Sequence, residues 1–63
     1  MTIHILVAED NSDILDVLRE VLEGDGYRVT CAPNGRDALK AFECETPDLI
    51  VTDLHALVRW LHD

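Results

Sequence analysis

Three short apolar segments are spaced along the chain. Residues 3–8 (IHILVA) form a nearly continuous apolar run, which is typical of a strand buried on both faces of a parallel sheet. Residues 27–31 (YRVTC) alternate between apolar and polar, which favours a strand with one face in water near a sheet edge. Residues 48–53 (DLIVTD) again hold three successive apolar residues, so this pattern predicts a third strand that is buried on both faces.

The segment between the first two predicted strands has the spacing of an amphipathic helix. Apolar residues recur within residues 14–22 at intervals of three and four, which places them on one helical face. Asn11 or Ser12 is suited to cap the start of this helix, because their side chains accept hydrogen bonds from free backbone N–H groups. Gly24 or Gly26 can end it by adopting a positive φ.

A second, shorter helix is predicted from the apolar positions within residues 38–42, with Asn34 as its cap and Pro47 beyond its end. Strands and helices therefore alternate as βαβαβ, which predicts a parallel α/β sheet with right-handed crossovers. Because the first and third strands have interior patterns and the second has an edge pattern, we expect the strand order 2-1-3. A C-terminal helical segment is predicted from apolar residues at helical spacing, namely Leu54, Leu57, Val58 and Leu61.

Three carboxylates follow the two interior strands. Glu9 and Asp10 come directly after the first strand, and Asp53 comes at the end of the third. Parallel strands end at the same edge of a sheet, and ligands of such sheets bind beyond the carboxyl ends of the strands. Each of them alone is better explained as a polar loop residue, but because all three follow neighbouring strands we expect their side chains to converge in one crevice.

Close carboxylates repel one another unless some are protonated or a cation lies among them. Mg²⁺ suits a small set of oxygen ligands that leaves positions for water and a phosphoryl group. Beside such an ion a carboxylate can act as a nucleophile on phosphorus and form an aspartyl phosphate. The residues thus indicate a metal-dependent site for phosphoryl chemistry.

The composition limits the alternatives. Sixty-three residues allow one small domain, and 48% apolar residues exclude a disordered tail. A net charge of −8 disfavours a nucleic-acid surface, and no apolar run reaches the length of a membrane span. There is no signal-peptide pattern, and Cys31 and Cys44 have no metal-ligand spacing, so we expect a protein of the reducing cytoplasm.

Three stretches together resemble the receiver domain of two-component response regulators: ILVAEDN, LEGDGYRVTCAPNGRDAL and PDLIVTDL. The resemblance covers residues 1–54 and implies a flavodoxin-like fold in a signal-transduction phosphoprotein. It implies that Asp53 is the phosphoacceptor and that Glu9, Asp10 and Asp53, with the backbone carbonyl of His55, bind Mg²⁺. It also implies a sensor histidine kinase as the phosphoryl donor, and a module that is not itself an enzyme.

The sequence also departs from the family pattern. The Met-Pro pair and the glycine that usually follow the phosphoacceptor are absent, and residues 55–63 diverge as a helical tail. The family's switch Ser or Thr and its phosphate-binding Lys follow later strands, and Lys40 cannot replace that Lys because it lies on the second predicted helix. We therefore interpret residues 1–63 as a single receiver-like domain truncated to its N-terminal half, with a residual phosphoacceptor site.

An alternative function is structural. A third strand with an interior pattern but no further strand beyond it would expose an apolar edge, and pairing with a second copy would cover that edge. We therefore expect a homodimer through the third strand and the C-terminal helix, which as a pure dimerisation module would perform no phosphotransfer. A metal site across chains at His55 and His62, and a mononucleotide site, are weaker alternatives, the latter because residues 8–13 (AEDNSD) contain no glycine.

Overall fold

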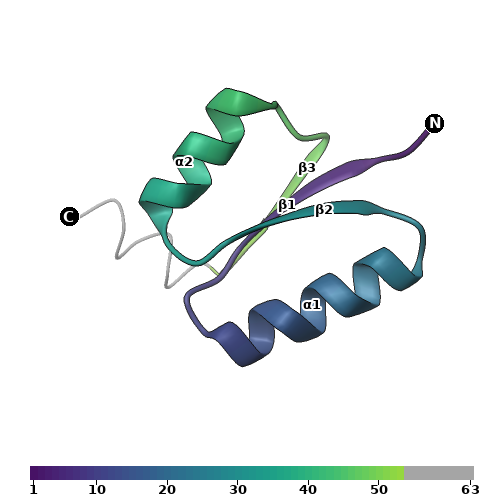
Figure 1. Ribbon diagram of the computed structural model, residues 1–63, viewed down its shortest axis with the longest axis horizontal. Helices are drawn as coiled ribbons and strands as arrows, with labels where there is room; N and C mark the ends of the chain where they lie inside the picture. The colour runs from purple at the N-terminus through teal and green to yellow at the C-terminus, as the bar shows by residue number, and fades with distance from the viewer. Residues whose placement is uncertain (54–63) are drawn as a thin grey trace.

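The computed structural model describes residues 1–53 and shows a three-stranded parallel sheet with two helices (Figure 1). The elements in chain order are β1 (His4–Ala8), α1 (Ser12–Gly24), β2 (Arg28–Ala32), α2 (Gly35–Cys44) and β3 (Leu49–Thr52). Both pairings of β1 are parallel, and the strand order is β2-β1-β3. This confirms the predicted βαβαβ order and the 2-1-3 sheet, whereas the predicted C-terminal helical segment lies outside the described residues.

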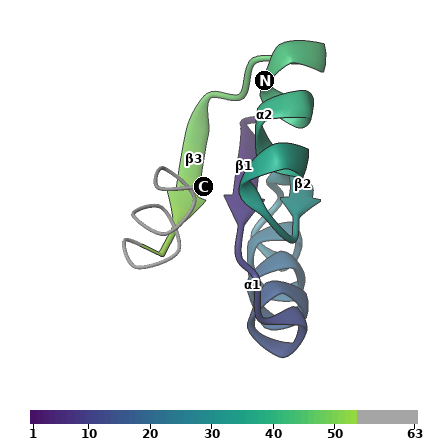
Figure 2. The ribbon, with the colours of Figure 1, turned by 90° about the vertical axis from the view of Figure 1, so that its left-hand side faces the viewer.

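The two helices cover opposite faces of the sheet (Figure 1). The chain moves outward from β1 to β2 through α1, and then back past β1 to β3 through α2. Two right-handed crossovers in opposite directions place their helices on opposite faces. Both helices pack on β1 and β2. Figure 2 shows β3 on the far side of β1 from β2, at the edge of the sheet.

The core is centred on β1, every residue of which is buried. Val7, the fourth of its five residues, has no exposed surface, because it has a strand on either side and a helix over the sheet. The prediction of full burial was correct for β1 and wrong for β3. In β3 the side chains of Leu49 and Ile50 are 54% and 47% exposed, because α1 and α2 lie over the other two strands.

The second strand also differs in part from its prediction. It begins at Arg28, which is exposed as expected for a wet face. Thr30 and Ala32 lie on the same side of the strand as Arg28 by alternation, yet Thr30 is half-buried and Ala32 is fully buried. Because α2 packs over this side of β2, only the first residue of the predicted wet face remains in water.

Asparagine side chains cap both helices. Asn11 is the cap of α1, and its Oδ1 accepts hydrogen bonds from the backbone N–H groups of Asp13 and Ile14, at 3.0 and 3.2 Å. Asn34 caps α2, as predicted, and accepts from the N–H of Asp37 at 2.8 Å. Beyond α1 it is Gly26 that takes the positive φ, at 94°, so the turn into β2 depends on that glycine.

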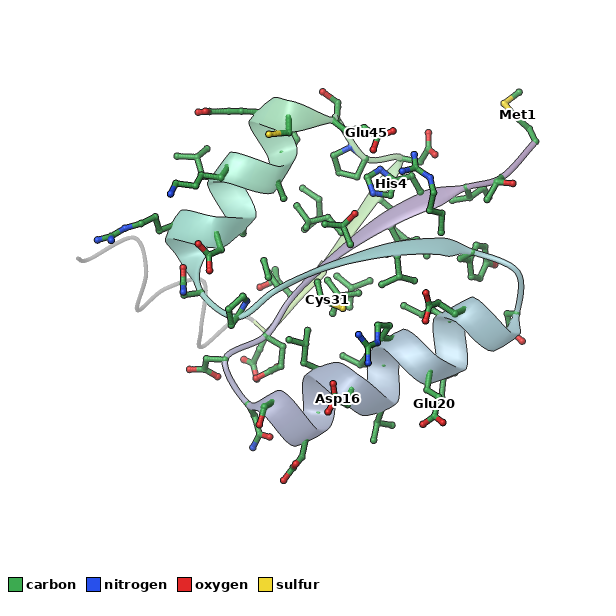
Figure 3. The ribbon with its side chains drawn as sticks, in the orientation of Figure 1. Met1, His4, Asp16, Glu20, Cys31 and Glu45 are labelled. Carbon is green, nitrogen blue, oxygen red and sulfur yellow. The ribbon has the colours of Figure 1, made fainter. Side chains whose placement is uncertain are left out.

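The amino end of the sheet is joined by two reciprocal hydrogen bonds between His4 and Asp48. The N–H of His4 donates to Oδ2 of Asp48 at 2.8 Å, and the N–H of Asp48 donates to the carbonyl oxygen of His4, also at 2.8 Å. The His4 ring is buried, and its Nε2 lies 2.7 Å from Oγ1 of Thr30 (Figure 3). His4 thus links β1 to the middle of β2 and to the residue that precedes β3.

We expect Asp48→Ala to lower the free energy of unfolding by about 1–2 kcal/mol, because it leaves the N–H of His4 without its carboxylate acceptor. Asp48→Asn keeps a side-chain oxygen at this position and should lose less. Urea denaturation of the two variants beside the native chain measures both effects. Equal losses for the two variants would show that the acceptor oxygen is not the cause.

The side chains of Arg28 and Glu45 form an exposed bidentate ion pair that connects β2 to the end of α2. Nη1 of Arg28 donates to Oε1 of Glu45 at 2.8 Å, and Nη2 donates to Oε2. This hydrogen bonding lowers the pKa of the Glu45 carboxyl and raises the pKa of the Arg28 guanidinium. The pair therefore contributes to stability while Glu45 is ionised.

This pKa shift gives an expected pH dependence. Because the Glu45 pKa is lower in the folded chain than in the unfolded chain, its contribution is complete above the ordinary glutamate value and is lost as pH falls through the folded value. Glu45→Gln should therefore be less stable than the native chain at neutral pH, and the difference should vanish in acid. Thermal unfolding from neutral pH into acid measures this, and a pH-independent difference would contradict it.

Candidate functional site

The strand register brings the predicted carboxylates to one edge of the sheet. β1 and β3 pair from Ile5 with Leu49 through Ala8 with Thr52. Glu9 and Asp53 are the next residue on each strand, so their backbones leave the carboxyl edge at the same level. Neighbouring strands lie about 4.8 Å apart, which places these two residues within reach of a shared ligand.

Glu9 is held firmly at this edge. It is only 7% exposed, its N–H donates to the carbonyl oxygen of Ala32 at 3.0 Å, and its Oε1 accepts from the N–H of Asn11 at 3.0 Å. The backbone bond joins the ends of β1 and β2, and the side-chain bond joins β1 to the start of α1. A carboxylate in this position is also stabilised by the partial positive charge of the helix N-terminus.

Asp10 and Asp53 are exposed at the same edge. Asp10 lies in the loop between β1 and α1, and Asp53 follows the last residue of β3. Exposure at the end of a strand leaves a carboxylate accessible to a large reaction partner. The structure therefore gives the three carboxylates distinct settings, with Glu9 buried and bonded and the two aspartates at the surface. His55 lies outside the described residues.

The donor chemistry of these residues fits Mg²⁺, which prefers carboxylate and carbonyl oxygens. Among residues 1–53 no group of three or more His, Cys, Asp or Glu side chains is arranged to hold a metal ion. Mg²⁺ is usually held by one or two protein carboxylates, with water and phosphate oxygens completing its shell. A pair of carboxylates would therefore suffice, and the full ligand set of Glu9, Asp10, Asp53 and His55 stays a prediction.

The sequence pattern did not indicate the role of Asn11 at this edge. Its backbone N–H binds Glu9 while its side chain caps α1, so one residue both orients a carboxylate and starts a helix. An asparagine after Glu9 and Asp10 predicts a helix cap, but it does not predict the hydrogen bond from the Asn11 N–H to Glu9. That contact depends on the conformation of the loop, which the pattern of apolar residues does not specify.

A parallel β2-β1-β3 sheet with helices on both faces, and with carboxylates after β1 and β3, defines a doubly wound α/β domain of the receiver type. The family model of the response regulator receiver domain matches residues 5–56, which is most of the chain. The chain belongs to this family. None of the described helices is long and apolar enough to span a bilayer.

Individual relatives agree with this assignment. An uncharacterized 14.6 kDa protein from the sodA1 3' region of Leptolyngbya boryana is 48% identical over 50 residues, which are 79% of this chain and 38% of that protein. The alkaline phosphatase synthesis transcriptional regulatory protein PhoP of Bacillus subtilis is 46% identical over 54 residues, which are 86% of this chain and 22% of that protein. The chain thus spans well under half the length of these curated relatives.

Proposed function

We propose that the chain is a phosphoacceptor module of two-component signalling in the cytoplasm, and that Asp53 receives the phosphoryl group from a phosphohistidine of a sensor histidine kinase. The observation that carries this proposal is the register of β1 and β3, which brings exposed Asp53 level with Glu9 on the neighbouring strand. Membership of the receiver family supports it. The module accepts a phosphoryl group and is not itself an enzyme.

In the proposed reaction a carboxylate oxygen of Asp53 forms a bond to phosphorus while the bond from phosphorus to the donor nitrogen breaks. The product is an aspartyl phosphate. Glu9 and Asp10, with Asp53 and the His55 carbonyl, would hold the Mg²⁺ ion, which when bound neutralises negative charge shared by the carboxylates and the phosphoryl group. The hydrogen bond from Asn11 to Glu9 orients one of these carboxylates in advance.

The reaction of residues 1–63 alone should be slow. The one lysine of this sequence, Lys40, lies on α2, and no serine or threonine follows Asp53. Residues 1–63 therefore supply neither a lysine nor a hydroxyl side chain, of the kind expected from the family, to donate hydrogen bonds to the phosphoryl group. The loss of one such donor slows a reaction by about 10²–10³. Incubation with acetyl phosphate and Mg²⁺, followed by intact-mass measurement and peptide mapping, should show slow, partial phosphorylation at Asp53 that EDTA abolishes. Phosphorylation at another residue would overturn the proposal.

Self-association is the second candidate function, and the exposed apolar residues of β3 favour it. Within residues 1–53, β3 has a strand neighbour on its β1 side alone, and Leu49 and Ile50 expose about half of their surface. Two copies that pair through β3 would join two three-stranded sheets into one sheet of six strands, with each edge covering the other. The predicted helical stripe within residues 54–63 would form the rest of this interface.

Light scattering over a concentration series tests this second candidate. We expect a dimer for the native chain and a monomer for Ile50→Lys, because a charge on an edge strand opposes edge pairing. Val17→Lys is the matched control, since Val17 is exposed on α1, away from β3, and its replacement should leave the dimer intact. A compact, folded monomer of the native chain at all concentrations would exclude self-association.

A further inference from the structure

The chain contains two asparagines, and each caps a helix. Asn11 is followed by Ser12, and Asn34 is followed by Gly35. This difference matters chemically, because the backbone nitrogen after an asparagine can attack the side-chain amide carbon, and a side chain on the next residue obstructs that attack. Gly35 has no side chain, so Asn34 is chemically the more vulnerable of the two.

The contacts of the two caps also differ. Oδ1 of Asn11 accepts two backbone hydrogen bonds, whereas Oδ1 of Asn34 accepts one, from the N–H of Asp37 at 2.8 Å. Nδ2 of Asn34 additionally donates to Oδ2 of Asp37 at 3.3 Å, near the long limit of a hydrogen bond. Asn34 is exposed, so water has access to this cap.

The helix that Asn34 caps is weakly anchored. α2 has ten residues, none of them fully buried, and helices of this length are marginal without tertiary packing. Segments with few buried contacts open locally far more often than the whole chain unfolds. The first N–H groups of a helix also have no acceptor within the helix, so the Gly35 N–H is not committed to a helical hydrogen bond. A brief opening at the start of α2 therefore releases the reacting groups.

We propose that Asn34–Gly35 is a site of spontaneous covalent modification, at which Asn34 deamidates whenever the start of α2 opens. The Gly35 nitrogen forms a bond to Cγ of Asn34 and loses its proton, while the bond from Cγ to Nδ2 breaks and ammonia leaves. Water then opens the resulting succinimide. Attack at Cγ gives aspartate, and attack at the main-chain carbonyl carbon gives isoaspartate, in which the chain runs through Cγ.

The two products affect the fold differently. Aspartate caps helices as well as asparagine does, but it replaces the Nδ2 donor by an oxygen that faces the Asp37 carboxylate. Isoaspartate lengthens the main chain by one carbon, which displaces the oxygen that binds the Asp37 N–H. Both products add a negative charge two residues beyond Ala32, whose carbonyl accepts the N–H of Glu9. The modification thus acts on the loop that supports the carboxyl edge of the sheet.

Ageing of the full chain in warm, mildly alkaline buffer tests the proposal, with peptide mapping by mass spectrometry as the readout. We expect the mass increase that accompanies replacement of an amide NH₂ by OH in the Asn34 peptide, and no change in the Asn11 peptide. An isoaspartate methyltransferase assay should label the Asn34 peptide alone. Moderate urea should accelerate the modification by opening α2.

Gly35→Ala is the matched variant, because Gly35 does not adopt a positive φ, so its backbone conformation is one that alanine also adopts. Alanine also favours the helix, so the native chain and the variant are compared again in strong denaturant, where α2 is absent in both. A several-fold slower reaction of the variant under both conditions is expected. Equal rates in denaturant, equal modification of Asn11 and Asn34, or an unmodified Asn34 peptide would each overturn the proposal.

Discussion

Asp53→Asn should abolish phosphorylation by acetyl phosphate, because the carboxamide cannot supply the anionic oxygen that attacks phosphorus. Asp53 is exposed after the last residue of β3, so its replacement should leave the cooperative unfolding transition intact. Intact-mass measurement after a fixed incubation gives the phosphorylated fraction, and circular dichroism checks the fold.

Asp16→Asn is the control for this experiment. Asp16 is also an exposed aspartate, but it lies on α1, where it pairs with Arg19 at 3.6 Å. Its replacement should leave the phosphorylated fraction unchanged. If Asp53→Asn retained the native level of phosphorylation, the acceptor would be another group, and the assignment of Asp53 would be wrong.

Val7→Asp should unfold the chain. Val7 on β1 is fully buried, and an unpaired carboxylate there costs several kcal/mol in desolvation. A chain of 63 residues has a total stability of roughly 3–9 kcal/mol at about 0.05–0.15 kcal/mol per residue. The cost is thus comparable with the whole stability. Circular dichroism should show loss of the folded spectrum and of cooperative thermal unfolding.

Val17→Asp makes the same chemical change on the surface. Val17 is 58% exposed on α1, and valine and aspartate have similar helix propensities. We therefore expect a shift within about 0.5 kcal/mol, as for most surface substitutions. A folded Val7→Asp variant, or equal losses for the two variants, would contradict the assignment of β1 as the centre of the core.

The elements and their order were predictable from the sequence because their signals are local. The apolar run of β1, the helical spacing within α1 and the cap at Asn34 each depend on neighbouring residues, and the alternation of strands with helices then implies parallel pairing. That Glu9 and Asp53 follow paired strands at one edge of the sheet also results from this pairing, so their placement at that edge was predictable, while their joint role as a site stays a prediction.

What the sequence did not reveal depends on packing between distant segments. The exposure of Leu49 and Ile50 and the burial of Ala32 are set by where the helices lie over the sheet, which the pattern within each strand does not specify. The bond between His4 and Asp48 joins residues 44 positions apart. Its formation depends on register and on a single side-chain conformation, and neither leaves a periodic signal.

The central position of β1 has a consequence during protein synthesis. β1 is the most deeply buried strand and pairs on both sides, yet it precedes both of its neighbours in the chain. When β1 leaves the ribosome, its apolar side chains and both rows of its backbone polar groups stay unpaired until β2, and then β3, have also emerged. During that interval the nascent chain presents an apolar strand with two open edges, which is the arrangement most prone to aggregation.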